Sequence, residues 1–573
     1  MTADASTTGS RSIVPPDSDA FAVVAVEEHA SLPTAGDGDL WPSAWADDDA
    51  LYAACGDGLG FADGDWSDIL VNRIDGTPAT GLSGERLSSG RDVAPVWTDP
   101  SRFNSKPTGM VAVDGNGDGR DELYLAVQDL RHGATPDTFN TAPAAGIVRS
   151  DDYGRTWHHG AGPMFTGEMT TLMFLDLGRS SSGAKVLRDL VPPDAEDPAG
   201  FVYAYGLDHN WRTSYSGVVP DPEDLYLARV RVDAIQDRAS WRFFAGLDGG
   251  APLWSAALAE RVPVLTDTRR TGTGEPVVTG PKPVPGSVLA QGGVVYNAPL
   301  RRFLYTSWTE FTFEFYEAPT PWGPWRRILT HDFGPFPWRG PLAAEARHGG
   351  YATTVPSKFI SADGREAWVQ SNWFVGASTY GGSSYGFSLR RLRLEPMPAP
   401  GSPPHPVAGG SNLAALPQAQ PFATACRSGQ LGVLVDGRSD RAEDSWNGVV
   451  KEREHWGVAW PFPVVTDAVE YTTGPFDNGS GWFVEPPQVE VRDGAGWRVV
   501  DGTTIEPAYP CSAAATGRRT FTFRFPAQVT TGIRIAGRAG GWGGYTSIAE
   551  LVVRAAGTAD GTTASADRGS ITA

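Results

Sequence analysis

Two aspartates near the start of the chain are spaced so that they could act as a pair. Residues 38–61, GDLWPSAWADDDALYAACGDGLGF, contain five aspartates and read as a hairpin with strands at 41–46 and 50–55. If the turn centres on Asp48, then Asp39 and Asp57 face each other at the open end. Opposed Cβ atoms lie about 5 Å apart, and like charges there are destabilising. Such a pair needs a metal, a basic partner or a catalytic role.

The other aspartates of this hairpin are expected to be structural. Asp47–Asp49 lie between the two strands, and Asp is favoured in turns because its side chain bonds nearby backbone. A second turn is marked by SDDYGRTW at 150–157, which fits the Asp-box pattern S-x-D-x-G-x-T-W of sialidase-like and other β-propellers. In that pattern Asp152 caps the loop amides, Gly154 takes a positive φ and Trp157 packs under the turn.

A further acidic segment has the spacing of a calcium loop. DGNGDGRDE at 114–122 follows D-x-N-x-D-G-x-x-E, with Gly119 at the sharp bend. It lacks the helices and the position-12 Glu of an EF-hand and resembles the shorter calcium loops found in propeller hairpins. We expect Ca²⁺ as a structural ion, and no organic cofactor; a solvated polar hairpin is the alternative. The expected ligands are Asp114, Asn116, Asp118 and Glu122.

Charge and cysteine content exclude several classes of protein. The net charge is −20, which argues against nucleic-acid binding and favours a neutral or cationic ligand. The cysteines are too few for a disulfide framework and have no zinc spacing. Cys55 is expected in the core, and a Cys426–Cys511 bridge is left open.

No segment of the sequence predicts a membrane anchor. No apolar run approaches the roughly 18 residues of a membrane span. The first 21 residues lack the apolar region of a signal peptide. The chain is therefore expected to stay in the cytoplasm, to be exported by another route, or to lack its native leader. We expect it to act as a monomer.

Turn residues divide the chain into many short strands, which predicts an all-β protein. About eighteen strand-like runs, such as ELYLAV and RFLYTSW, precede a Pro- and Gly-rich stretch, and further strands follow it. At four strands per blade, this number gives four or five propeller blades, and five is the more familiar closed form. The expected organisation is a disordered tail at 1–18, a β-propeller catalytic domain at 19–397, a linker at 398–410, a β-sandwich at 411–556 and a disordered tail at 557–573.

The first domain resembles the five-bladed propeller superfamily that holds the arabinanases and the actinobacterial endo-D-arabinanases. The likeness is carried by WPSAWADDDALY, KPTG, the Asp-box, LYLARV, SWRFFAGLD, VVYN and APTPWGPW, which follow in this order. It covers about residues 20–395 and implies a propeller of glycosidase type, usually secreted. In such propellers the catalytic acids project from the innermost strands into a central pocket.

The C-terminal region resembles discoidin-like (coagulation factor 5/8 type C) carbohydrate-binding modules, which are jelly-roll β-sandwiches. The matching segments are NLA at 412–414, VDG at 435–437, WRVV at 497–500, TGIRI at 531–535 and SIAELVV at 547–553. The resemblance implies a second structural Ca²⁺ near Asp436 and Glu550. A plain sandwich without a ligand is the alternative, since fold does not imply function.

Glycoside hydrolysis fits the paired carboxylates, because it needs one acid for the leaving oxygen and a second carboxylate as base or nucleophile. We predict Asp39 and Asp57 as this pair, and the hairpin register favours the short separation of a retaining enzyme. The substrate is expected to be a polysaccharide or oligosaccharide, with arabinan or another cell-wall glycan suggested by the resemblance. Further residues expected to bind the sugar or supply the acid are Lys106, Asp208, His209, Trp308, Glu310 and Trp373. Glu314 is a further candidate for the acid.

Two other functions are compatible with the sequence. A polysaccharide lyase on the same propeller would use His209 or Tyr205 as base, with basic residues around the pocket. A non-catalytic protein would bind carbohydrate with both domains. Release of reducing ends, or of an unsaturated uronide that absorbs in the ultraviolet, distinguishes the three.

Overall fold

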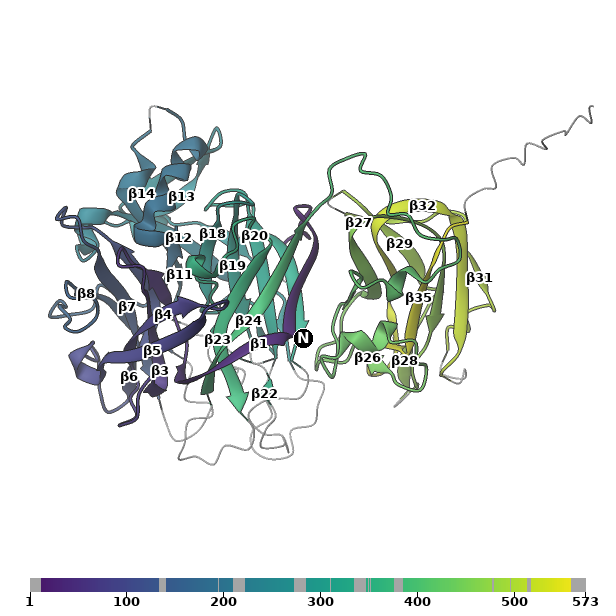
Figure 1. Ribbon diagram of the computed structural model, residues 1–573, viewed down its shortest axis with the longest axis horizontal. Coiled ribbons are helices and arrows are strands. Elements are labelled where there is room, and N and C mark those ends of the chain that lie inside the picture. The colour runs from purple at the N-terminus through teal and green to yellow at the C-terminus, as the bar shows by residue number, and fades with distance from the viewer. Residues whose placement is uncertain are drawn as a thin grey trace, which may run out of the picture. The chain divides into compact units, whose positions relative to one another are not determined.

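The computed structural model describes most of the chain between residues 12 and 557. The undescribed parts within that span are residues 133–140, 194, 210–221, 273–284, 310, 334–346, 349, 351, 376–384, 477–478, 495 and 513–516. At residues 28–35, 347–348 and 373–375 only the backbone is described. The chain divides into two compact units: Met1–Pro396 with Ala425–Gly429 and Trp446–Val449, and Met397–Thr424 with Gln430–Ser445 and Val450–Ala573. Both units are built from strands (Figure 1).

The first unit is a five-bladed β-propeller. Blade one contains β2 (Ser43–Trp45), β3 (Leu51–Gly60), β4 (Leu70–Thr77) and β5 (Gly81–Ser89), and blade two contains β6 (Phe103–Val113), β7 (Glu122–Arg131), β8 (Ala144–Ser150) and β9 (Phe165–Thr166). Blade three contains β10 (Thr171–Asp176), β11 (Phe201–Leu207), β12 (Asp224–Arg231), β13 (Arg242–Asp248), β14 (Ala251–Ser255) and β15 (Pro263–Thr266). Blade four contains β18 (Gly293–Asn297), β19 (Arg302–Trp308), β20 (Thr312–Ala318) and β21 (Arg326–Asp332), after a short pair of β16 (Arg270–Thr271) and β17 (Gly286–Ser287).

Blade five is completed by the N-terminal strand. It contains β22 (Arg347–His348), β23 (Glu366–Val375), β24 (Tyr385–Pro396) and β1 (Phe21–Asp39), and Figure 1 shows β1 beside β24. Val24 of β1 pairs with Leu394, whereas the far end of β1 crosses to blade one, where Asp39 pairs with Gly56 of β3. The strand that closes the ring therefore also delivers Asp39 to blade one.

The inner strands are close-packed around the axis. Strand β6 is buried along nearly its whole length, whereas β5, at the outer edge of blade one, alternates between exposed and half-buried residues. This difference follows from the places of the two strands, since β6 is the first strand of its blade and β5 is an edge strand. Gly109 of β6 shows how closely the blades approach, because a Cβ there would lie 2.6 Å from the Leu172 carbonyl oxygen.

The second unit is a β-sandwich with one large sheet and two small strand pairs. The large sheet contains β25 (Gln420–Ala423), β27 (Glu454–Thr472), β29 (Gln488–Asp493), β30 (Gly496–Val499), β31 (Thr504–Glu506), β32 (Thr520–Gly537) and β35 (Glu550–Ala555). The pairs are β26 (Glu443–Asp444) with β34 (Ser547–Ile548), and β28 (Ser480–Phe483) with β33 (Ala539–Gly541). Trp456, Trp460 and Tyr471 lie in its core.

Short 3-10 helices connect the strands in both units. They are η1 (Gly90–Asp92), η3 (Arg179–Leu190), η4 (Pro198–Gly200), η5 (Val232–Ala234), η6 (Arg238–Ser240), η7 (Leu258–Glu260), η8 (Ser357–Phe359), η9 (Leu413–Ala415) and η10 (Leu431–Val435). Among the described residues, no helix has both the length and the apolarity needed to cross a bilayer.

The predicted segment boundaries differ from the structure in two places. Residues 13–18 were expected in a disordered tail, but the backbone of Ser18 donates to the Arg327 carbonyl at 2.8 Å and Arg327 Nε donates to the Pro15 carbonyl at 2.9 Å. Part of the expected linker also packs on the sandwich, since the His405 ring stacks on Phe462 with centroids 4.2 Å apart.

The three cysteines are free thiols, so no Cys426–Cys511 bridge is present.

Candidate active site

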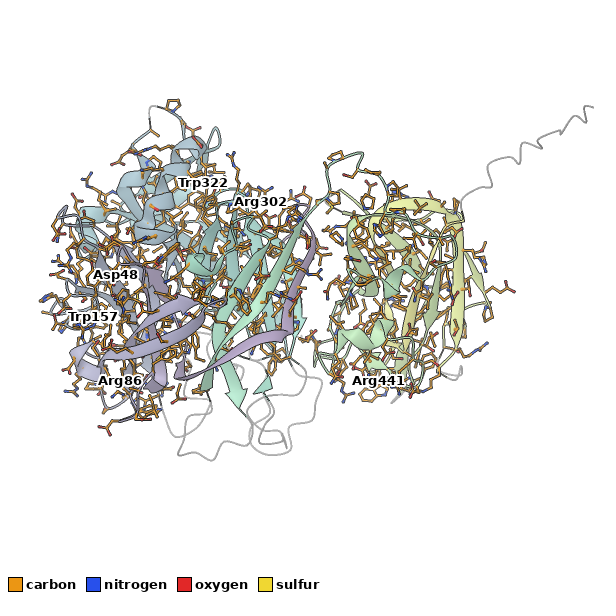
Figure 2. The ribbon with its side chains drawn as sticks, viewed as in Figure 1. Asp48, Arg86, Trp157, Arg302, Trp322 and Arg441 are labelled. Atoms are coloured by element: carbon orange, nitrogen blue, oxygen red, sulfur yellow. The ribbon has the colours of Figure 1, made fainter. Side chains whose placement is uncertain are left out.

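The turn at Asp47–Asp49 is structural, as its sequence predicts. Asp48 Oδ1 accepts from the Ala50 backbone at 3.0 Å, and its other oxygen pairs with Arg73. Asp47 accepts from the Tyr153 hydroxyl at 2.9 Å. Figure 2 labels Asp48 at this turn. These contacts use the turn carboxylates within the fold, so the turn acids do not belong to the candidate catalytic pair.

The second predicted turn is also held by its own side chains. Asp152 Oδ1 accepts from the backbone of Arg155 at 3.1 Å and of Thr156 at 2.8 Å. Gly154 has a φ of +86°, and the Trp157 indole, labelled in Figure 2, is nearly buried and donates to Ser88 Oγ at 3.1 Å. Asp152 therefore caps a loop and lies outside the candidate active site.

Asp39 and Asp57 converge on a single lysine. Asp39 is 3% exposed and Lys106 is 2% exposed, whereas the Asp57 side chain keeps 25% exposure. Lys106 Nζ forms an ion pair with Asp57 Oδ1. A Cβ on Gly56 would lie 2.7 Å from Asp39 Oδ1 and 3.1 Å from Lys106 Nζ, so the second carboxylate also lies beside the ammonium group. Asp57 therefore has a basic partner, and the charge of Asp39 acts on the same ammonium group.

The pairing register differs by one residue from the prediction. Asp39 pairs with Gly56 and not with Asp57, and side chains of adjacent strand residues normally point to opposite faces. Asp57 has a φ of +47°, which breaks this alternation and lets its carboxylate reach Lys106. The short hairpin distance predicted from direct opposition therefore rested on the wrong register.

Unusual backbone geometry surrounds both carboxylates. Leu40 and Trp41, directly after Asp39, have φ values of +75° and +45°. The Trp41 indole is fully buried, donates to the Gly38 carbonyl at 2.8 Å and packs edge-on against Phe387. Non-glycine residues in this region cost on the order of 1–3 kcal/mol each and cluster at functional sites. The strain around Asp39 and Asp57 therefore supports a functional role.

Electrostatics couple the members of this cluster. Burial raises the pKa of Asp57, Lys106 opposes the shift, and the Asp68 carboxylate adds to it. Burial alone would lower the pKa of Lys106, but Asp57, Asp39 and Asp68 together raise it above its ordinary value. Lys106 is therefore held protonated, and Asp57 keeps a proton to a higher pH than a free aspartate does. Such shifts are common where a carboxyl group must exchange protons.

Several polar side chains near the pair were missed by the sequence reasoning. Asn104 Nδ2 donates to Asp68 Oδ1 at 2.8 Å, next to Lys106 on β6. Gln128 of β7 lies opposite Lys106 of β6 in the sheet and accepts from the Thr171 hydroxyl at 2.7 Å. Gln128 Nε2 is buried without a hydrogen-bond partner among the described residues. Side-chain amides within strands belong to no sequence motif, so their position beside the pair is visible only in the fold.

The other predicted sugar-binding residues have different outcomes. Asp208 pairs with Arg261 at 2.8 Å, and His209 Nδ1 lies 2.8 Å from the Gly167 carbonyl oxygen, so both are held on blade three. Trp308 was predicted to stack on sugar rings, but it is 1% exposed because its indole donates to the Gln291 carbonyl within the core. Lys106 was predicted to bond sugar hydroxyls and is instead buried against Asp57. Glu310 and the Trp373 side chain lie outside the described residues.

Glu314 has a structural environment in blade four. The residue is 1% exposed, and burial raises its pKa. Its carboxylate accepts from the Thr330 hydroxyl at 2.8 Å and pairs with Arg269 at 3.2 Å. These contacts are with its own blade and the segment leading to it, so Glu314 is not part of the Asp39–Asp57 cluster.

The acidic loop at 114–122 places its carboxylates together. One oxygen from each of Asp114, Asp118 and Glu122 lies within 4.8 Å of the others. Asp114 also accepts from the backbone of Gly117 at 2.6 Å and of Gly119 at 2.9 Å. This arrangement gathers hard oxygen donors of the kind that Ca²⁺ takes.

The second predicted calcium position, in the sandwich, contains a buried carboxyl group. Glu550 is 7% exposed, and its Oε1 accepts from the Gly437 backbone at 3.3 Å. Its Oε2 is buried without a hydrogen-bond partner among the described residues. Burial, with Asp436 nearby, raises the pKa of Glu550 to about 7. An orphaned buried oxygen beside a second carboxylate fits a cation ligand.

The sandwich also presents an exposed tryptophan. Trp542 is 80% exposed and follows β33. The backbone of the next residue, Gly543, donates to Ser480 Oγ at 2.9 Å, which fixes this turn against β28. A Cβ on Gly479 would lie 3.2 Å from Trp542 Cδ1, so the indole passes close to that glycine. Val450, 65% exposed, lies near the same turn, since a Cβ on Gly544 would lie 2.9 Å from it.

Comparisons with solved structures give distant likenesses. No protein-family model and no curated protein matches the chain. A GH43_1 enzyme from Xanthomonas citri is similar over 65% of this chain and 91% of its own, with 14% identity and a TM-score of 0.33. A family 32 carbohydrate-binding module from C. perfringens NanJ, solved with galactose, is similar over 24% of this chain and 93% of its own, with 21% identity and a TM-score of 0.19. Likenesses at this level carry no inference about activity.

Proposed function

We propose that the protein is a glycoside hydrolase whose working carboxylates are Asp39 and Asp57. The observation that carries the proposal is their convergence, from the end of β1 and from within β3, on the buried Lys106. Burying several charges in one place is costly unless they are paired. The neighbouring residues with positive φ add backbone strain. A fold that keeps both buried charge and strain at one place is typical of a functional site.

The chemistry would use the two carboxylates on either side of a glycosidic bond. One carboxyl group would donate its proton to the leaving oxygen, and the other would act as base or nucleophile at the anomeric carbon. The exposed fraction of Asp57 gives the pair access to solvent, and its raised pKa suits a group that keeps its proton to higher pH than a free aspartate does. The net charge of −20 favours a neutral sugar over an acidic one.

The resemblance of the propeller segments to arabinanases supports a furanoside substrate. We propose arabinan or a related cell-wall glycan, acted on outside the cell. The structure argues against Tyr205 as the base of the lyase alternative, because this residue is fully buried and donates to the Pro321 carbonyl at 2.7 Å. A buried phenol whose hydroxyl is already used in a hydrogen bond is a poor base for proton abstraction from a sugar.

The test is incubation with a panel of arabinans, other neutral cell-wall glycans and uronate polymers. We expect new reducing ends from a neutral glycan, without an ultraviolet-absorbing product. An unsaturated uronide would support the lyase instead. Binding without bond cleavage across the panel would support a carbohydrate-binding protein and contradict the hydrolase.

We further propose that the sandwich binds the polymer through Trp542. An exposed indole held on a fixed turn provides a flat apolar face for stacking on a sugar ring. Trp542→Ala should weaken binding to insoluble polymer by at least about tenfold, while turnover of a short oligosaccharide stays near wild type. Pull-down isotherms and oligosaccharide kinetics measure the two effects. Val499→Ala, at another exposed apolar position of the sandwich, is the matched control.

We also propose calcium at both acidic positions, Asp114–Glu122 in the propeller and Asp436–Glu550 in the sandwich. A ligand that binds the native state raises its stability in proportion to ln(1 + [L]/Kd). Calcium should therefore raise the melting temperature of the chelator-treated protein, and Asp118→Ala and Glu550→Gln should each reduce part of that rise. Differential scanning fluorimetry measures the shift. Identical melting curves in calcium and in excess chelator would exclude both sites.

A further inference from the structure

Acidic groups from β1, from β3 and from the segment before β4 lie near Lys106. Asp37 and Asp39 come from β1, Cys55 and Asp57 from β3, and Asp68 from the segment before β4. Asp37 accepts from the Leu59 backbone at 3.0 Å, and Asp68 accepts from Asn104, so both have other partners. Burial and the nearby acids keep the Cys55 thiol neutral by raising its pKa well above the ordinary value. Asp39 and Asp57 are the hairpin acids that face the ammonium group, and the Asp68 carboxylate, which also lies against Asp57, adds to the negative charge there.

The charge of this buried group depends on the protonation of the pair. When Asp39 and Asp57 share one proton, the pair carries a single negative charge. The positive charge of Lys106 then balances the charge of the pair. Without Lys106, the same singly protonated pair would be a buried negative charge, which is unfavourable in a site of low dielectric. One proton on two carboxylates is also the state that acid–base cleavage of a glycosidic bond requires.

We propose that Lys106 is a positioning residue that holds Asp39 and Asp57 in the singly protonated state and fixes them beside Gly56, without touching the sugar. This inference rests on the proposed hydrolase function. It differs from a sugar-binding lysine, because Lys106 is 2% exposed and its ammonium group lies on Asp57. The nearby Gly56 has no side chain, which lets both groups approach the same point.

The activity test compares Lys106→Met and Lys106→Arg in the full chain across pH. An opposite charge within 4–6 Å lowers a carboxyl pKa by about 1–3 units. Removing it should therefore move both limbs of the kcat/KM profile to higher pH by about 1–3 units, with a lower kcat and little change in KM. Lys106→Arg keeps the charge, so its limbs should move less than those of Lys106→Met, although its larger guanidinium group must be accommodated beside Gly56. Lys185→Met, at an exposed lysine of η3, is the control.

Three results would overturn the inference. Unmoved pH limbs with a raised KM in Lys106→Met would make Lys106 a sugar ligand. A limb shift above about one unit in Lys106→Arg would show that charge is not what the site requires, and this variant remains informative if the methionine variant does not fold. The third is an unchanged titration of the Asp39 and Asp57 carboxyl groups in Lys106→Met, measured by ¹³C NMR with Asp39→Asn and Asp57→Asn for assignment.

The titration separates this inference from the proposed function. It needs no substrate, so it reports on Lys106 even if no glycan is cleaved. A titration shift of about 1–3 pH units without any hydrolysis would contradict the hydrolase and leave the electrostatic role of Lys106 in place. Hydrolysis with an unshifted titration would support the hydrolase and contradict the electrostatic role of Lys106.

Discussion

Replacing Asp39 or Asp57 by asparagine should lower kcat about 10²–10⁴-fold, the usual contribution of general acid–base catalysis. Asparagine keeps the size of the side chain but can neither donate the proton nor carry the charge. Both carboxylates lie beside the same ammonium group, so loss of either removes the pair. Reducing-end release from the best substrate of the panel measures the effect.

The Asp57→Asn substitution should change stability in the direction opposite to that expected for two carboxylates without a basic partner. On sequence alone, removing one of two facing carboxylates relieves repulsion and raises stability. The structure places Lys106 against Asp57, so Asp57→Asn also leaves a buried ammonium group with one fewer partner. Breaking one side of a buried ion pair destabilises proteins by about 3–5 kcal/mol, and the 25% exposure of Asp57 reduces this cost. We therefore expect a lower melting temperature, read by circular dichroism.

Asp48→Asn is the matched control for these variants. It lies in the same hairpin and loses an ion pair with Arg73, but both side chains are partly exposed. Exposed pairs contribute about 0–1 kcal/mol, so stability should fall only slightly and kcat should stay near wild type. A fall in kcat as large as that of Asp39→Asn would show that the hairpin acids act through folding, and it would remove the case for a catalytic pair.

Local patterns were sufficient to predict the hairpin and to separate its turn acids from its end acids. Turn preference is a property of a few consecutive residues, so Asp47–Asp49 were recognisable from sequence. Register is set by the surrounding sheet, and here β1 enters from blade five, which fixes Asp39 opposite Gly56. The positive φ of Asp57 could not be expected from its residue type alone. These two features together decide where the carboxylates point.

The partners of the pair could not be predicted because they come from separate segments. Lys106 belongs to blade two, and only the packing of blade two against blade one brings β6 beside β3. The sequence predicts Lys106 at the end of a strand-adjacent loop and available to sugar, since burial cannot be read from residue type. Trp308 failed for the same reason: among 20 tryptophans most are expected in the core, and periodicity does not say which are.

Gly56→Ala should lower kcat by about 10²-fold, the loss that a misplacement of about 1 Å produces in an active site. The backbone of Gly56 does not lie in the left-handed region, so alanine is allowed there and the effect comes from space alone. The added Cβ would lie 2.7 Å from Asp39 Oδ1, 3.0 Å from the Asp68 carbonyl oxygen and 3.1 Å from Lys106 Nζ. Real Cβ atoms do not tolerate the first of these distances, so the Asp39 carboxylate must move away from the ammonium group. Overpacking costs about 1–3 kcal/mol, which a melting curve will show alongside the kinetics. Gly162→Ala is the control, because a Cβ there meets nothing within 4 Å. Wild-type kcat in Gly56→Ala, with the melting temperature lowered, would mean that the cluster tolerates displacement of Asp39 and that this carboxylate takes no part in bond cleavage.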